Sequence, residues 1–324
     1  MALDASMISR SNLSGLIPEP VTREIIQGVT ADSAVLSMGR KLPNMGSKTQ
    51  TLNVLDSLPL AYFVEGDNGQ KKTTNMAWDK KKIYAEEVAV IVPIPEAVLD
   101  DSNYDIWGEV KPRITEAFGK VIDAAILFGT NKPTNWRDGL VPSAVAAGNV
   151  VTRASATPDP GVFAEIMGVD GLIAKVEESG YLPTGAMAAV KMRAQLRGLV
   201  DSNGIPIFKT DMQGTTQYAL DGVPLVFPMN GAFDASEALM IVGDFSQLTY
   251  AIRKDIEFKI FTEGVVQNTD KTIAYNLMQD DMVALRAVMR LGWEIPNPIN
   301  AYNADNENRF PFAVYKPAVV TPAG

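Results

Sequence analysis

The sequence predicts a mixed α/β (α+β) fold, and three observations indicate it. Residues 103–128 have apolar side chains three or four positions apart, the spacing of one long amphipathic helix. Residues 250–260 and 282–295 alternate apolar and polar side chains, which predicts strands, with a helix left open as the alternative for the second segment. From 139 to 277, short helical and short apolar segments follow one another, so a second mixed unit is expected.

The N-terminal region of the chain is expected to contain one short helix. After a poorly ordered start, the segment IPEPVTREIIQGV (17–29) predicts a short helix entered through its two prolines. Its residues Val21, Ile25 and Val29 recur every four positions, as on one face of a helix. The start of the chain lacks a basic region followed by an apolar stretch, and no apolar run is long enough to span a membrane. A cytoplasmic product is therefore expected.

Residues 49–83 are expected to form a long β-hairpin. Apolar runs flank a polar, glycine-containing centre, and the alternating segment IYAEEVAVIVPI (83–94) supplies a strand on the C-terminal side. The segment 67–82 is placed at the hairpin tip. It contains the lysines Lys71, Lys72, Lys80, Lys81 and Lys82. Trp78 lies among them, and because an indole at an exposed tip is unfavourable unless it is covered, a partner contact is predicted there.

This gathering of lysines contrasts with the formal net charge of the chain, which is −9. Three explanations of such a run of lysines are open: a nucleic-acid contact, a solvated loop, and a contact with an acidic neighbouring subunit. The acidic balance argues against a dedicated nucleic-acid reader. Arg286 and Arg290 share one face of the strand 282–295, where they are expected either to face solvent or to pair with carboxylates of a neighbour. The candidate intersubunit contacts are therefore Lys71, Lys72, Trp78, Lys80, Lys81, Lys82, Arg286 and Arg290.

The long helix is expected to pack along a single apolar stripe. The stripe consists of Trp107, Val110, Ile114, Phe118, Val121, Ala125 and Phe128. The charged residues fall mainly off it; they are Lys111, Arg113, Glu116, Lys120 and Asp123. Gly129 is placed as the C-terminal cap. Pro112 is expected either to kink the helix or to mark the start of its regular part.

Shorter elements follow the long helix. Residues 158–179 predict a second helix and residues 190–200 a third. The apolar runs 223–228 and 239–243 predict buried strands. Beyond the strand 282–295, a polar, proline-rich tail of low order is expected.

The chain contains neither cysteine nor histidine, which narrows its chemistry. Disulfides, zinc-thiolate sites and Ser-His-Asp or Cys-His catalysis are excluded. The segment GRKLPNMGSKT (39–49) has the wrong spacing for a phosphate-binding loop, because Ser47 separates Gly46 from Lys48. No catalytic residue, cofactor or metal ligand is therefore predicted. A carboxylate- or lysine-dependent enzyme is the weakest hypothesis, and it predicts a small oligomer with a polar pocket.

The order of these elements resembles the major capsid protein family of tailed bacteriophages, which has the Hong Kong 97-like fold. The resemblance covers residues 17–303. The segments that carry it are LIPEPVTREIIQGV, the hairpin, NYDIWGEVKPRITEAFGKVIDAAILFG, GVPLVFPMN, ALMIVGDFSQLTYAIRKDIEFKI and QDDMVALRAVMRLGWEIPNPINAY. The divisions that it implies are an N-terminal arm (1–48), an extended loop (49–83), a peripheral domain with the spine helix (84–138), an axial domain (139–277), a return strand of the peripheral domain (278–303) and a C-terminal tail (304–324).

The resemblance implies a structural function. Family members assemble as hexamers and pentamers into the icosahedral head that encloses double-stranded DNA, so the expected location is the virion capsid after assembly in the host cytoplasm. The implied partners are other copies of the chain, a portal, an optional decoration protein, and packaged DNA in non-specific contact with the inner surface. Assembly is expected to depend on a separate scaffolding protein, or on none. No membrane partner is expected. An encapsulin-type protein compartment, which shares the fold, is the alternative.

Some family members cross-link a loop lysine to an asparagine of a neighbouring subunit, with a glutamate as catalyst. Lysines are present in the hairpin, and Asn297 and Asn300 lie near the corresponding end strand. No glutamate of this chain aligns with the catalytic position. No cross-link is therefore predicted from the resemblance.

Overall fold

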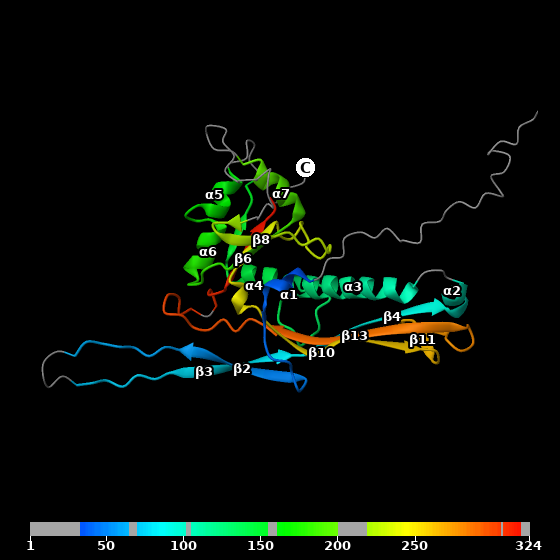
Figure 1. Cartoon of the computed structure of the whole chain (residues 1–324). Helices are drawn as coiled ribbons and strands as arrows, with labels where there is room; N and C mark the ends of the chain where they lie inside the picture. The colour runs from blue at the N-terminus through cyan, green and yellow to red at the C-terminus, as the bar shows by residue number, and fades with distance from the viewer. Residues whose placement is uncertain are drawn as a thin grey trace, which may run out of the picture.

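The long helix α3 (Ile106–Phe128) forms the axis of the molecule in the computed structural model (Figure 1). The structure describes residues 33–64, 70–101, 105–154, 161–199, 219–305 and 307–318. The side chain of Asp105 caps the helix by accepting a hydrogen bond from the Gly108 amide, and Gly129 ends it in the left-handed conformation, with φ 73°. The predicted helix and its glycine cap are confirmed, and the helix continues through Pro112. The helix expected over 17–29 lies outside the described residues.

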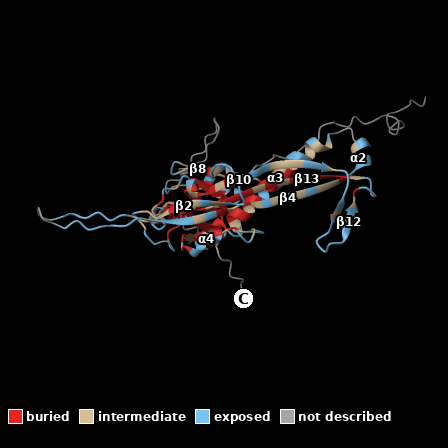
Figure 2. Ribbon diagram, turned by 90° about the horizontal axis from the view of Figure 1, so that it is seen from below, coloured by how far each residue is buried: buried red, intermediate tan, exposed pale blue. Residues whose placement is uncertain are grey.

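A four-stranded sheet lies against α3. Its order is β1 (Arg40–Lys41), β10 (Thr249–Phe261), β13 (Met282–Glu294) and β4 (Glu86–Pro95). Leu285, Ala287, Met289 and Leu291 of β13 are buried in one apolar cluster with Ile114, Phe118, Ile122 and Ile126 of α3. The strand interpretation of 282–295 is confirmed. Figure 2 shows this core as the buried part of the molecule.

The placement of β10 differs from the sequence expectation. The sequence assigned this segment to the axial domain, but β10 pairs along its length with β13, for example Tyr250 with Trp293 and Phe261 with Ala284. Its apolar residues Ile256 and Phe258 pack on the cluster around α3. The alternation of residues 250–260 correctly predicts a strand. It cannot show to which sheet the strand belongs, because the partner strand begins more than twenty residues later in the sequence.

A six-stranded sheet forms the second unit. Its order is β5 (Val150–Thr152), β14 (Phe312–Lys316), β9 (Met240–Gly243), β6 (Gly185–Ala188), β8 (Val223–Val226) and β7 (Ala219–Leu220). Four short helices accompany it: α4 (Leu140–Ala146), α5 (Val162–Met167), α6 (Leu172–Glu178) and α7 (Val190–Arg197). Met240 and Val242 face α5, α6 and α7, whereas Ile241 faces the cluster of α3 and α4. The sheet is therefore buried on both sides.

Two expectations for this unit are wrong. The tail expected over 304–324 contains β14, whose side chains from Phe312 to Tyr315 are buried between β5 and β9. The single helix expected over 158–179 is two helices, because the segment from Gly168 to Gly171 interrupts it. A Cβ at Gly168 would lie 2.3 Å from the carbonyl oxygen of Ala164, so only glycine permits this turn.

The hairpin projects from the sheet at the end opposite to α2 (Glu96–Asp101) (Figure 1). It consists of β2 (Thr49–Ser57) and β3 (Ala77–Tyr84), which pair antiparallel. A hairpin was predicted, but its second strand is β3 and not the segment 83–94. That segment divides at Ala85 into the end of β3 and the start of β4. Within the described ranges, no helix has the length and apolar character to cross a membrane.

Candidate intersubunit contact site

The lysines expected at the hairpin tip divide between a strand and the outer part of the hairpin. Lys80, Lys81 and Lys82 lie in β3 and pair with Asn53, Leu52 and Thr51. Lys71 and Lys72 lie outside the paired strands and are exposed. The predicted tip position is therefore wrong for Lys80, Lys81 and Lys82. They belong to the paired strand β3, which the sequence did not predict because its residues are mostly polar.

The two faces of the hairpin differ. Because side chains alternate along a strand, Trp78, Lys80 and Lys82 share one face, and Lys81 and Ile83 share the other. Ile83 is fully buried against Met45, Ala85 and Ala251, with Leu42 and Leu52 beside them. We call the first the outer face, defined by Trp78, Lys80 and Lys82 with their cross-strand partners Leu55, Asn53 and Thr51.

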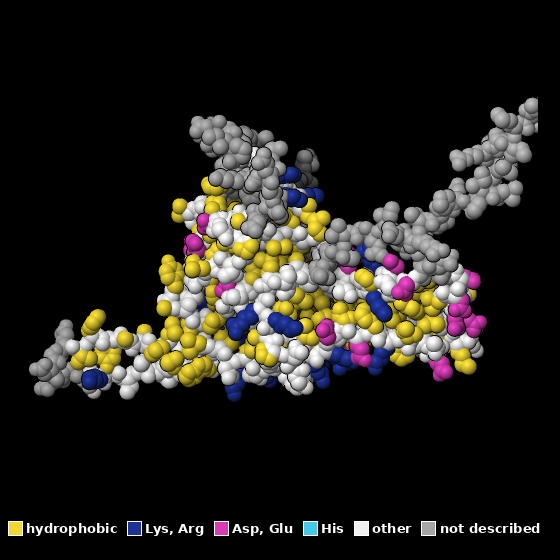
Figure 3. All heavy atoms as spheres, viewed as in Figure 1, with side chains coloured by type: hydrophobic (Ala, Val, Ile, Leu, Met, Phe, Trp, Pro, Cys, Tyr) yellow, Lys and Arg dark blue, Asp and Glu magenta, His cyan; other side chains and the backbone are white. Residues whose placement is uncertain are grey.

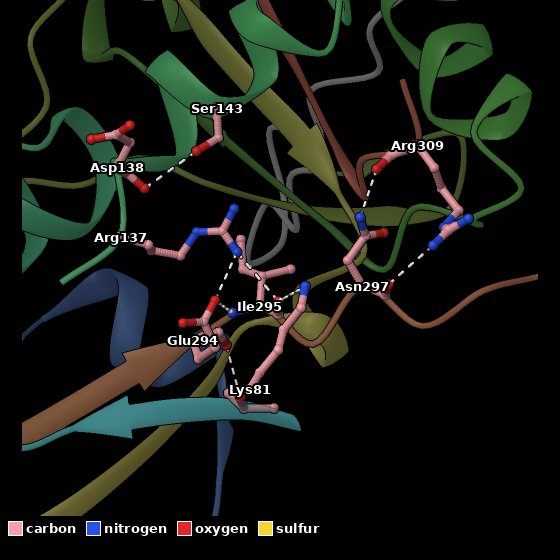
Figure 4. Close-up of polar contacts among 9 residues, drawn as sticks. Lys81, Arg137, Asp138, Ser143, Glu294, Ile295, Asn297 and Arg309 are labelled. Carbon is pink, nitrogen blue, oxygen red and sulfur yellow. Dashed lines mark hydrogen bonds and ion pairs between the residues drawn. The ribbon is translucent and has the colours of Figure 1, made fainter. Parts of the chain in front are cut away.

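Lys81 attaches the hairpin to its own subunit (Figure 4). Its Nζ donates a hydrogen bond of 3.4 Å to the Ile295 carbonyl oxygen. Arg137 donates to the same carbonyl at 3.2 Å and forms an ion pair with Glu294 at 2.9 Å. Burial, followed by the nearby Arg137 charge, lowers the pKa of the Lys81 ammonium. Lys81 is thus committed to a contact within the subunit, unlike Lys80 and Lys82.

The outer part of the hairpin exposes apolar side chains. The Leu60 amide donates to Thr74 Oγ1 at 3.0 Å, and Tyr62 donates its hydroxyl proton to the Lys72 carbonyl oxygen at 2.9 Å, so the two legs stay linked beyond the paired strands. The exposed apolar residues are Leu60, Tyr62, Phe63, Val64, Met76 and Trp78. The Trp78 side chain is 64% exposed. A run of this kind favours a covering partner.

Arg286 and Arg290 form a separate group on the four-stranded sheet. Arg290 Nε donates to Glu87 Oε2 at 2.7 Å. The Arg286 guanidinium lies 4.7 Å from the centre of the Phe261 ring. The structure therefore does not bring these arginines together with the outer face of the hairpin.

The sequence missed a buried carboxylate in α3. Asp123, which was placed mainly off the apolar stripe, is fully buried and accepts hydrogen bonds from Ser33 Oγ, from the amides of Ala34 and Val35, and from Asn230 Nδ2. These bonds hold the first turn of α1 (Ala34–Met38) on α3. Burial raises the pKa of the Asp123 carboxyl, although the four hydrogen bonds oppose the shift.

A sequence signal for this burial existed. Ile122 and Ile126 form an apolar row beside the expected stripe, and both are buried, whereas Val121 on that stripe is 48% exposed. The buried face of the helix is therefore rotated relative to the expected one, and it includes Asp123.

The asparagines considered for cross-linking are engaged inside the subunit. Asn297 Nδ2 donates to the Arg309 carbonyl oxygen at 2.7 Å (Figure 4). Its Oδ1 accepts from the Tyr181 hydroxyl at 2.8 Å. Asn300 Nδ2 donates to the Ser179 carbonyl oxygen at 3.0 Å. Both side-chain nitrogens therefore have internal partners.

The fold and the length of the chain match known proteins. The profile of the phage capsid family matches residues 14–301. The chain belongs to the phage capsid family. The major capsid protein of Staphylococcus phage 80alpha is 28% identical over 284 residues, which cover 87% of this chain and 82% of that protein.

Solved structures of phage proteins have the same fold as this chain. A structure from Microbacterium phage Oxtober96 is 32% identical, with a TM-score of 0.81 over 96% of this chain and 100% of that chain. One from Mycobacterium phage Adephagia is 29% identical, with a TM-score of 0.82 over 98% of this chain and 100% of that chain. The predicted Hong Kong 97-like capsid fold is confirmed, and these relatives favour a phage capsid over an encapsulin-type shell. The capsid protein is a structural component of the virion shell.

Proposed function

We propose that this capsid protein forms the hexamers and pentamers of a tailed-phage head around double-stranded DNA, and that the hairpin joins neighbouring subunits. The exposed hairpin supports this most strongly. An isolated subunit leaves Leu60, Phe63 and Trp78 in water, and a second copy would cover them. Because the capsid protein is present in many copies, such a contact needs no other component.

Different parts of the hairpin have different roles in this proposal. Lys81 and Ile83 fix the hairpin to its own subunit, whereas Trp78 is the anchor for the neighbour and Lys80 and Lys82 orient it. Lys71 and Lys72 extend the cationic surface outward. Arg286 and Arg290 take a secondary contact on the sheet.

Other partners follow from the family function. A separate scaffolding protein and a portal assist assembly, a decoration protein is optional, and the inner surface contacts packaged DNA without sequence preference. The net charge of −9 makes that contact weak, since phosphates are repelled by an acidic protein. The role is structural and not enzymatic, in line with structural relatives.

Electron microscopy tests the proposal. The protein, expressed alone and together with its scaffolding protein, is expected to give hollow particles of uniform size in negative stain. Only small oligomers under both conditions would contradict the capsid role. Double-stranded DNA extracted from native particles distinguishes a phage head from an enzyme-carrying compartment.

A further inference from the structure

One face of the four-stranded sheet carries a small polar pocket with a volume of about 140 Å³. Its charged lining residues are the cations Lys254, Lys259, Arg286 and Arg290 and the carboxylates Glu87 and Glu257. They come from the three neighbouring strands β10, β13 and β4. In the view of Figure 3, Lys and Arg side chains gather along the lower edge of the molecule, below this sheet. The pocket is therefore part of a cationic surface on an acidic chain.

The alternation of β13 places two of the cations on the face of the sheet that is turned away from α3. Leu285 and Met289 are buried in the apolar cluster around α3. Because successive side chains of a strand point to opposite faces, Arg286, Val288 and Arg290 point to the other side. Val288 lies between the two arginines in the lining of the pocket. The arginines thus form two sides of the pocket, with an apolar residue between them.

A β-bulge in β10 adds the lysines to this face. From Lys254 to Glu257 the strand β10 advances by three residues, while β13 advances by two, from Arg290 to Val288. In a regular strand, residues three apart lie on opposite faces. Here the extra residue lets Lys254 and Glu257 line the same pocket. Bulges next to active sites re-aim side chains in the same way, so this arrangement is typical of a site for a ligand.

The register of the two strands places like charges opposite each other. Lys254 lies opposite Arg290. Lys259 lies opposite Arg286. Side chains that face each other across two antiparallel strands have their Cβ atoms about 5 Å apart, and like charges in such positions destabilise the pairing. An anion between these two cation pairs would remove the repulsion of both.

The two carboxylates of the pocket neutralise only part of its positive charge. Glu257 forms ion pairs with both Lys254 and Lys259, and Glu87 forms one with Arg290. Hydrogen bonds from the two lysines hold the pKa of the Glu257 carboxyl below its usual range, so this group is ionised at neutral pH. Four cations and two carboxylates leave the lining with a net charge of +2.

Arg286 is the cation of the pocket that lacks a carboxylate partner. Among the described residues, no carboxylate lies within ion-pair distance of its guanidinium, and its Nε atom is buried without a hydrogen-bond acceptor. The guanidinium lies 4.7 Å from the centre of the Phe261 ring, which holds it in place from one side. A buried N–H group without an acceptor is unfavourable, so an acceptor from outside the chain would stabilise this residue.

We propose that this pocket binds a tetrahedral oxyanion of the phosphate or sulfate class. A doubly charged ion matches the net charge of the lining. The planar guanidinium of Arg286 presents its N–H groups as a fork that fits two oxygens of such an ion, and Lys254 and Lys259 supply point charges beside it. Free inorganic phosphate and the phosphodiester groups of nucleic acid share this chemistry. The site is separate from the hairpin, so it goes beyond the proposed function and does not depend on it.

Anion titration of the dissociated full-length subunit tests the site. Inorganic phosphate, exchanged against chloride at constant ionic strength, is expected to raise the midpoint of urea unfolding along a curve that saturates, because the ligand binds the folded state. Constant ionic strength keeps general charge screening the same throughout. Arg286→Gln is expected to weaken the apparent affinity about tenfold, since hydrogen bonds between charged groups are the strong ones. The matched control, Arg113→Gln, removes the same charge from α3 on the other side of the sheet and should leave the affinity unchanged.

The variant Arg286→Lys separates geometry from charge. It keeps the positive charge but lacks the fork, so it is expected to recover only part of the affinity that Arg286→Gln loses. Affinity equal to that of the wild type would overturn the proposed recognition by the guanidinium. Sulfate in place of phosphate is expected to give a similar saturating curve, because the two ions have the same shape.

A short DNA duplex identifies the source of the phosphate group. If nucleic acid supplies it, the duplex is expected to raise the unfolding midpoint at a lower total phosphate concentration than the free ion, and Arg286→Gln should reduce the effect. If the free ion is the ligand, the duplex should have no effect that depends on Arg286. Both outcomes support oxyanion binding. Equal midpoints in phosphate and chloride, or an equal response of the wild type and Arg286→Gln, would overturn it and leave the capsid function untouched.

Discussion

The core around α3 and the hairpin differ in how their apolar side chains are covered. In the core, apolar side chains of α3 pack on β13 and need nothing outside the subunit. The hairpin is attached at its base by Ile83 and Lys81, and its outer part is exposed (Figure 2). Stability of the subunit therefore resides in one region and the capacity to assemble in the other, so substitutions should separate the two properties.

The largest expected effect is on the core. Phe118→Ala removes a buried ring between α3 and the sheet, and large-to-small changes of this kind cost about 3–5 kcal/mol in the free energy of unfolding. Chemical denaturation of the dissociated subunit measures it. The control is Val121→Ala, on the same helix but 48% exposed, which should cost less than about 1 kcal/mol. Equal losses at the two positions would disprove the burial of this helix face.

The next effect should fall on assembly alone. Trp78→Ala is expected to leave the free energy of unfolding of the subunit within about 0.5 kcal/mol and to weaken association by about 2 kcal/mol or more, because a central aromatic anchor is lost. Denaturation and light scattering of assembly measure the two quantities. Tyr302→Ala is the control, because Tyr302 is an aromatic residue outside the hairpin that is even more exposed than Trp78. A comparable loss of assembly in the control would remove the special role of the hairpin.

A smaller effect concerns Asp123 and pH. Its pKa is raised in the folded subunit, so between its ordinary value of 3.8 and the raised value the folded state binds more protons than the unfolded state. The free energy of unfolding therefore contains a component that falls as pH rises through this window. Asp123→Asn should lack that component. Urea denaturation of both proteins from pH 4 upward compares the slopes, and parallel curves would refute the assignment.

The smallest effect is expected at the sheet surface. Arg290 and Glu87 are both about half exposed, and exposed ion pairs contribute roughly 0–1 kcal/mol. Arg290→Ala should therefore change the free energy of unfolding by no more than about 0.5 kcal/mol, and added salt should remove the difference. A decrease of more than about 2 kcal/mol in the free energy of unfolding would contradict the surface position of this ion pair.

The sequence predicted the helices and strands whose apolar spacing is enough to identify them. The stripe of α3 and the alternation of β13 both correspond to real elements because one face of each meets apolar partners. Trp78, Asp79 and the lysines that follow read as a polar tip, yet they form β3 because β2 pairs with them and Ile83 anchors their end. The attachment of β3 to the subunit also depends on the hydrogen bond from Lys81 to Ile295. These two residues are 214 positions apart in the sequence.

The candidate site was predicted in part. Trp78, Lys80 and Lys82 are exposed as the prediction requires, whereas Lys81 is not available to a neighbour. Asp123 was missed because a single carboxylate within an apolar helix gives no sign of its partners on α1 and at Asn230. The acid pairs Asp100–Asp101 and Asp280–Asp281 are far apart in the sequence, and the fold brings their segments together through the hydrogen bond from the Glu96 amide to the Asp281 carbonyl oxygen.

The position of β14 has a consequence for the synthesis of the protein. This strand lies inside the six-stranded sheet, between β5 and β9, although it is encoded more than 150 residues after β5. A nascent chain that has not yet released residues 312–316 from the ribosome leaves the edges of β5 and β9 unpaired. The sheet can close only after translation has passed this point, so subunits become competent to assemble one complete chain at a time.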